Sequence, residues 1–133
     1  MASELRVDTL KDSSGNNSVG MAYVAEGSAK SWMNINGSSG TPTTRDSFNI
    51  SSITDNSTGR YGPVLTNAMA DTNYAPIGVT NSSTSDSFYA PNALGIGINN
   101  VITTTTSTFE ASSYGNTYYD SKYVFISVHG DLA

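Results

Sequence analysis

Short segments with alternating side chains, each ended by turn residues, are the feature of this sequence that most constrains its fold. In Lys122–Val128, the clearest of them, aliphatic residues alternate with aromatic or polar ones. Residues two apart lie on the same face of a β-strand, so this pattern predicts a strand. Comparable segments recur about every ten to fifteen residues from Lys30 onward, which is typical of a sandwich or barrel-like sheet. No segment has a convincing helical period longer than about two turns. The sequence therefore predicts an all-β chain.

The segment that follows Lys30 is expected to have two different faces. Trp32 and Asn34 fall on one face of the expected strand, and Met33 and Ile35 fall on the other. The strand should end at Asn36-Gly37, because both residues of this dipeptide tolerate the positive φ of a tight turn. Trp32 has two interpretations. A lone Trp on a strand usually packs in the core, but exposed aromatics beside Asn or Asp are how β-domains bind sugars.

Two more strands are expected before residue 70. Phe48 and Ile50 share a face of the first, which should end at Asp55–Gly59, and the second should run from Val64 to Ala68. Burying one face of each strand gives a predicted core. Its members are Met33, Ile35, Phe48, Ile50, Val64, Tyr123, Val124, Ile126 and Val128, with Trp32 in the core or at its edge.

Residues 1–28 differ from the rest of the chain. Leu5, Val7 and Leu10 are their only bulky apolar residues before Val19, so this segment has too little to bury to fold alone. We expect an N-terminal attachment arm over 1–28 and a compact antiparallel β-sandwich over 29–133. Small polar residues are abundant and apolar content is modest, so the core is expected to be completed against copies of the same chain.

Composition excludes several classes of function. The net charge is −5 with six basic residues spread singly, which argues against nucleic-acid binding. The absence of cysteine removes disulfides and thiolate metal sites. No apolar run is long enough for a signal peptide or a membrane span, so no membrane insertion is expected.

No catalytic, metal or cofactor site is predicted. His129 is the only histidine and follows the last strand segment, where a structural role is expected. Most Asp residues occur in turns, where they cap backbone amides. Asp12–Asn17 and Asp55–Gly59 only loosely resemble Ca²⁺ loops, because neither has a closing bidentate acid. The chain is expected not to be an enzyme.

Several segments together resemble a known family. The matching residues are Leu5–Asp12, Gly15–Asn17, Lys30–Gly37, Arg45–Asn56, Leu65–Met69, Asp71–Tyr74 and Tyr123–Asp131. They are similar to a domain of bacteriophage tail fibres and virion appendage proteins, of the type found in marine phages. The resemblance weakens between Asn81 and Tyr119.

The resemblance implies a non-enzymatic virion structural protein, made in the bacterial host cytoplasm. A short tail fibre or fibre-tip domain that contacts the host surface is expected, assembled as a homotrimer and docked on other virion proteins through the arm. A capsid decoration or head-fibre protein, or a carbohydrate-binding module, is the alternative.

Candidate contact residues follow from this implied function. Aromatics interleaved with small polar residues can bind a host surface glycan or protein, or can pack between subunits. The candidates for receptor contact are Phe88, Tyr89, Tyr114, Tyr118 and Tyr119. The candidates for subunit or particle contact are Leu5, Val7, Leu10 and Arg45. For Arg45, a local pair with an acid is the alternative.

Overall fold

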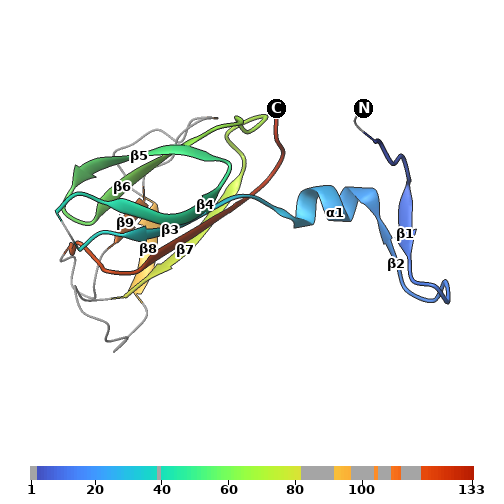
Figure 1. The fold of residues 1–133 in the computed structure, drawn as a ribbon, viewed down its shortest axis with the longest axis horizontal. Helices are drawn as coiled ribbons and strands as arrows, with labels where there is room; N and C mark the ends of the chain where they lie inside the picture. The colour runs from blue at the N-terminus through green and yellow to red at the C-terminus, as the bar shows by residue number, and fades with distance from the viewer. Residues whose placement is uncertain (1–2, 39, 82–91, 97–103, 105–108, 112–117) are drawn as a thin grey trace.

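The structure is a computed structural model, and it describes residues 3–38, 40–81, 92–96, 104, 109–111 and 118–133. Figure 1 shows the chain as an N-terminal segment beside a β-rich region. The N-terminal segment, residues 3–28, contains a hairpin of β1 (Thr9–Lys11) and β2 (Ser18–Gly20), followed by α1 (Met21–Gly27).

The N-terminal hairpin is closed by the side chain of Asp12. Its carboxylate accepts hydrogen bonds from the Asn16 backbone (3.0 Å) and the Asn17 side chain (2.7 Å). These bonds, the Asn17 side chain above all, lower the pKa of Asp12 below its ordinary value. Gly15 supplies the positive φ that the turn requires. The Asp12–Asn17 loop is thus a turn that is stabilised by the carboxylate of Asp12.

All the other strands in the described ranges belong to one antiparallel sheet of eight strands, in the order β4-β3-β10-β7-β8-β9-β6-β5. The strands are β3 (Ala29–Asn36), β4 (Thr43–Phe48), β5 (Ile50–Ser57), β6 (Arg60–Leu65), β7 (Ala75–Thr80), β8 (Asn92–Ile96), β9 (Phe109–Ala111) and β10 (Val124–His129). The predicted antiparallel β architecture is therefore confirmed. In the described part of the chain, α1 is the only helix, and it has seven residues.

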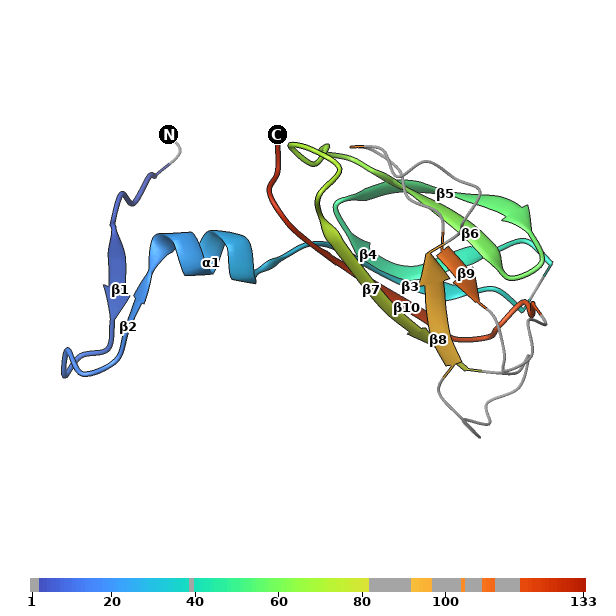
Figure 2. The same ribbon diagram turned by 180° about the vertical axis from the view of Figure 1, so that it is seen from behind.

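The two edge strands of this sheet, β4 and β5, are consecutive in the sequence. Figures 1 and 2 show that the sheet curls, so that its β5 end comes back toward β3 and β4. The chain passes from one edge to the other at Asn49, which has φ +56°. The prediction that Phe48 and Ile50 share one face of a single strand is therefore wrong. The positive φ at Asn49 separates β4 from β5, so the two side chains no longer point the same way. Ile50 packs against the core, whereas Phe48 is 53% exposed.

The core lies inside the curl and draws mainly on three strands. β3, β10 and β6 supply most of it, and two residues after β6 complete it. Its buried members are Met33, Ile35, Tyr61, Leu65, Met69, Tyr74, Val124, Ile126 and Val128. Five of these were predicted: Met33, Ile35, Val124, Ile126 and Val128.

The other predicted core residues occupy different positions. Val64 and Tyr123 are only partly buried, and Trp32 is exposed. The strand expected from Val64 to Ala68 begins earlier, at Arg60, so its inward residues are Tyr61 and Leu65 rather than Val64. Met33 and Ile35 face inward as predicted, and the opposite face of β3 carries Trp32 to the surface.

Candidate functional site

A buried polar network fixes the segment that carries two of the candidate tyrosines. Thr80, Asn81 and Ser121 are all almost completely buried. The Ser121 hydroxyl donates to the Asn81 carbonyl at 2.7 Å, and the Tyr123 N–H donates to Asn81 Oδ1 at 3.0 Å. The Thr80 hydroxyl is within 3.0 Å of the Tyr123 carbonyl. Buried, satisfied polar groups of this kind hold a segment in one conformation.

The turns after β3 and β5 are attached to the same segment. The Gly37 N–H donates to the Ser121 carbonyl at 2.8 Å, and the Gly59 N–H donates to Asp120 Oδ1 at 2.7 Å. The β3–β4 connection, the β5–β6 turn and residues 120–121 are thereby joined. Burial, reinforced by the nearby charge of Asp120, raises the pKa of Tyr61 to about 12.

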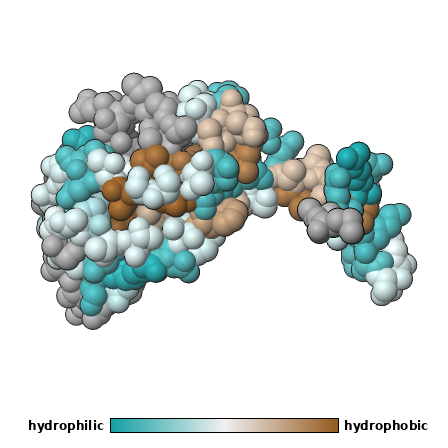
Figure 3. Space-filling model, turned by 45° about the horizontal axis from the view of Figure 1, so that its top comes forward, coloured by the Kyte–Doolittle hydropathy of each residue, from teal (hydrophilic) through white to brown (hydrophobic). Residues whose placement is uncertain are grey.

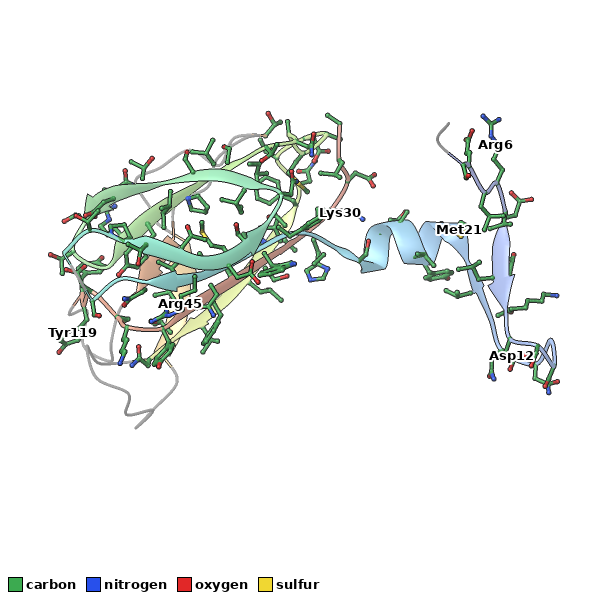
Figure 4. The ribbon with its side chains drawn as sticks, viewed as in Figure 1. Arg6, Asp12, Met21, Lys30, Arg45 and Tyr119 are labelled. Carbon is green, nitrogen blue, oxygen red and sulfur yellow. The ribbon has the colours of Figure 1, made fainter. Side chains whose placement is uncertain are left out.

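Tyr118 and Tyr119 stand directly before this anchored segment. They are 43% and 38% exposed, although the Tyr119 carbonyl accepts a hydrogen bond from the Ser121 N–H at 2.9 Å. In Figure 4, Tyr119 lies at the end of the β-region that is remote from the N-terminal segment. The other three predicted receptor-contact residues, Phe88, Tyr89 and Tyr114, lie outside the described residues.

A second candidate surface, which the sequence analysis did not predict as a site, is the outer face of the β4-β3-β10-β7 half of the sheet. We call it the outer face. Its large exposed side chains are Trp32, Phe48, Ile77, Val79 and Phe125. The strand register explains why they gather. Trp32 lies opposite Phe48 on one side and opposite Ser127 on the other, and Ser127 in turn lies opposite Ile77.

The next row of the outer face forms a shallow groove. Phe125 of β10 lies opposite Val79 of β7. The groove has a volume of about 360 Å³ and is lined by Ile77, Gly78, Val79, Phe125, Ile126 and Ser127. The alternation of Tyr123 and Phe125 with aliphatic residues was the sequence signal for this surface, because it placed large apolar groups on both faces of β10.

Arg45 lies at one end of the outer face, at a bulge where β4 pairs with β3. Its guanidinium donates to the Ile35 carbonyl at 2.6 Å and lies 4.5 Å from the ring centroid of Tyr123. The Tyr123 ring stacks in turn on Phe125, with 6.3 Å between centroids. Among the described residues no carboxylate lies within ion-pair distance of Arg45, so the alternative of a local pair with an acid is not observed.

The predicted contact residues of the N-terminal segment are at its surface. Leu5 is 80% exposed, and Val7 and Leu10 are exposed as well. Figure 3 shows apolar surface on both the N-terminal segment and the β-region. The chain therefore leaves two separate sets of apolar side chains uncovered.

Among the described residues, the imidazole ring of His129 has one polar neighbour. Its Nε2 lies 3.3 Å from the Ser127 hydroxyl. Within the described ranges, no carboxylate is within ion-pair distance of His129 to orient its ring, and no group of three or more His, Asp or Glu residues could hold a metal ion. That part of the chain also has no helix long and apolar enough to cross a membrane.

The chain matches no family model, no curated protein and no solved structure in comparisons with each of these.

Proposed function

We propose that this chain is a non-enzymatic virion protein of a bacteriophage, a short tail fibre or fibre-tip domain that takes part in attachment to the host surface. In this proposal residues 29–133 form a sandwich-like module, residues 1–28 form an attachment arm, and three copies assemble. The resemblance of several sequence segments to tail-fibre domains supports the proposal. The antiparallel β-region with a separate N-terminal segment is compatible with it.

Tyr118 and Tyr119 are the residues that we propose contact the host surface. Both side chains are exposed, yet the next two residues are tied to Gly59, Gly37 and Asn81 by hydrogen bonds. An aromatic contact surface on a rigid base binds a partner at low entropic cost, because little order has to be gained on binding. A tyrosine also offers an apolar ring and a hydroxyl together, which suits either a sugar or a protein surface.

The N-terminal segment suits attachment to the particle. Leu5 and Val7 precede the hairpin and are exposed, so they are available to another virion protein. Figure 4 places Arg6 and Tyr119 at opposite ends of the molecule. A chain that is attached at one end can present the other end to the host.

Immunogold labelling of the phage that encodes this chain tests the proposal. Label on the tail appendages is the expected result. Label on the capsid facets would replace the tail-fibre assignment by the capsid decoration alternative. Particles without label, together with selective binding of the purified chain to a glycan array, would favour the carbohydrate-binding module and overturn the virion assignment.

A further inference from the structure

The N-terminal hairpin has an apolar face that no described residue of its own copy buries. Leu10 of β1 and Val19 of β2 are directly opposite each other in the strand register, and both are exposed. The hairpin is a sheet of only two strands. Such a hairpin is at best marginally stable in water unless it packs on another surface. The hairpin therefore needs an apolar partner surface.

The outer face provides such a surface. Ile77, at 58% exposure, and Val79 rise from β7 beside Phe125 of β10 and border the groove described above. Contiguous apolar patches on a soluble protein commonly mark interaction sites. The groove is lined almost wholly by apolar atoms and β-strand backbone, which fits aliphatic side chains better than the polar groups of a sugar.

Charge also favours this pairing. The described N-terminal segment, residues 3–28, contains four acids and two bases, and one acid is already paired, since Glu4 and Arg6 are 2.8 Å apart. Next to the groove, Arg45 and Lys122 place their cationic groups 4.5 and 5.8 Å from the Tyr123 ring centroid. An acidic segment and a basic groove edge attract each other.

We propose that the hairpin of one copy inserts Leu10 and Val19 into the groove formed by Ile77, Val79 and Phe125 of a neighbouring copy. The inference rests on the proposed self-association and specifies its interface. The contact joins two different surfaces, so copies repeated around a threefold axis close a ring, which is the arrangement we propose for the homotrimer. Leu5 and Val7 precede the hairpin and stay available for the particle.

Two complementary variants of the full chain test this contact. The hairpin variant carries Leu10→Lys and Val19→Lys, and the groove variant carries Ile77→Lys and Val79→Lys. Sedimentation at micromolar concentration should show that each is a monomer. An equimolar mixture should form a heterodimer, because the hairpin variant keeps an intact groove and the groove variant keeps an intact hairpin. Far-UV circular dichroism and thermal unfolding of each variant establish that the β-region is folded.

The matched control is Ser52→Lys with Thr54→Lys, which adds the same charge to exposed positions of β5. It should assemble like the unaltered chain. Since the chain has no cysteine, Leu10→Cys with Ile77→Cys allows a direct check. A short bismaleimide should join these copies into multimers, whereas the pair Leu10→Cys with Ser52→Cys should stay uncrosslinked.

Three other outcomes would overturn the inference, and each points to a different explanation. A hairpin variant that still assembles means that the outer faces pair with each other or that a different surface is used. A groove variant that assembles normally but loses binding on a glycan array identifies the outer face as a sugar platform. If the unaltered chain is itself a monomer, the proposed self-association fails, and the inference fails with it.

Discussion

The backbone N–H of Asn67 donates to Oδ1 of Asn49 at 2.7 Å, and the Asn49 side-chain amide donates back to the Asn67 carbonyl at 3.2 Å. The same amide lies 3.0 Å from the Lys30 carbonyl. Asn49 thus joins the start of β3 to the end of β6 at the point where the chain passes from β4 into β5. Its positive φ, which Asn tolerates better than most residues, makes that passage possible.

We expect Asn49→Ala to destabilise the fold by about 2–4 kcal/mol, because it removes the side-chain hydrogen bonds and places a Cβ-bearing residue without them at a positive φ. Asn49→Gly should cost about 1 kcal/mol less, because glycine adopts this φ without strain. Urea unfolding followed by circular dichroism measures both. A loss below about 1 kcal/mol for the Ala variant would show that this connection does not hold the sheet edges together.

Gly37 is expected to accept no larger residue. A Cβ at this position would lie 2.1 Å from the Tyr61 hydroxyl and 2.8 Å from the Ser121 carbonyl oxygen. Gly37→Ala should cost about 1–3 kcal/mol, since the core must shift to admit it. Adding Tyr61→Phe removes the closest atom, so the double variant should be more stable than the sum of the two single effects by at least about 0.5 kcal/mol. Strict additivity would contradict the proposed clash.

The stability of the fold should fall at alkaline pH because of Tyr61. Burial and the charge of Asp120 raise its pKa from 10.0 to about 12 in the folded chain, so the unfolded chain loses this proton first. The stabilisation is complete below pH 10 and is lost as the pH rises from the unfolded pKa toward the folded one. Between pH 9.5 and 11, the loss in the free energy of unfolding should be on the order of 1 kcal/mol. Urea unfolding at these pH values measures it. Tyr61→Phe is the control and should remove this part of the pH dependence.

Truncating Ile35 and Phe48 tests which strand residues point into the core and which point to the surface. Ile35 is fully buried on β3, whereas Phe48 is mostly exposed on β4. Ile35→Ala should cost about 2–5 kcal/mol, and Phe48→Ala should change the stability of the isolated chain by less than about 1 kcal/mol. Thermal and urea unfolding of both variants provide the comparison. A large loss for Phe48→Ala in a monomeric sample would contradict the exposed position of this ring.

Local alternation predicted the strands at the two ends of the β-region. The alternation of apolar residues was enough to identify the inward-pointing side chains, which are Met33, Ile35, Val124 and Ile126. The pattern failed at Asn49, because a single residue with positive φ changes the face of everything after it and leaves no trace in hydrophobic periodicity. It also failed at Tyr123, which was predicted in the core and is only partly buried, and it left Trp32 open, which is exposed. Both faces of β3 and β10 carry large apolar groups, and alternation cannot say which face is covered.

The sequence predicted the aromatic residues of the candidate site but not the contacts that hold them in place. Tyr118 and Tyr119 stood out as aromatics among small polar residues. Their support comes from Asn81 and Gly59, which are far away in sequence. Hydrogen bonds of this range depend on how the strands are ordered in the sheet, and a single sequence does not reveal that order. The outer face likewise exists only because β7 lies beside β10.

Receptor contact through the tyrosine pair is tested by Tyr118→Ser with Tyr119→Ser. Both side chains are exposed and neither belongs to the buried core, so the thermal unfolding temperature and the oligomeric state should stay unchanged. Phage carrying the double variant should bind host cells reversibly with an affinity at least about tenfold lower, which corresponds to a loss of about 1.4 kcal/mol in binding free energy. Tyr23→Ser, which alters an exposed tyrosine of α1, is the matched control and should adsorb normally. If the double variant dissociates into monomers, the two tyrosines pack between subunits. Normal adsorption by an intact assembly would place the receptor contact elsewhere on the chain.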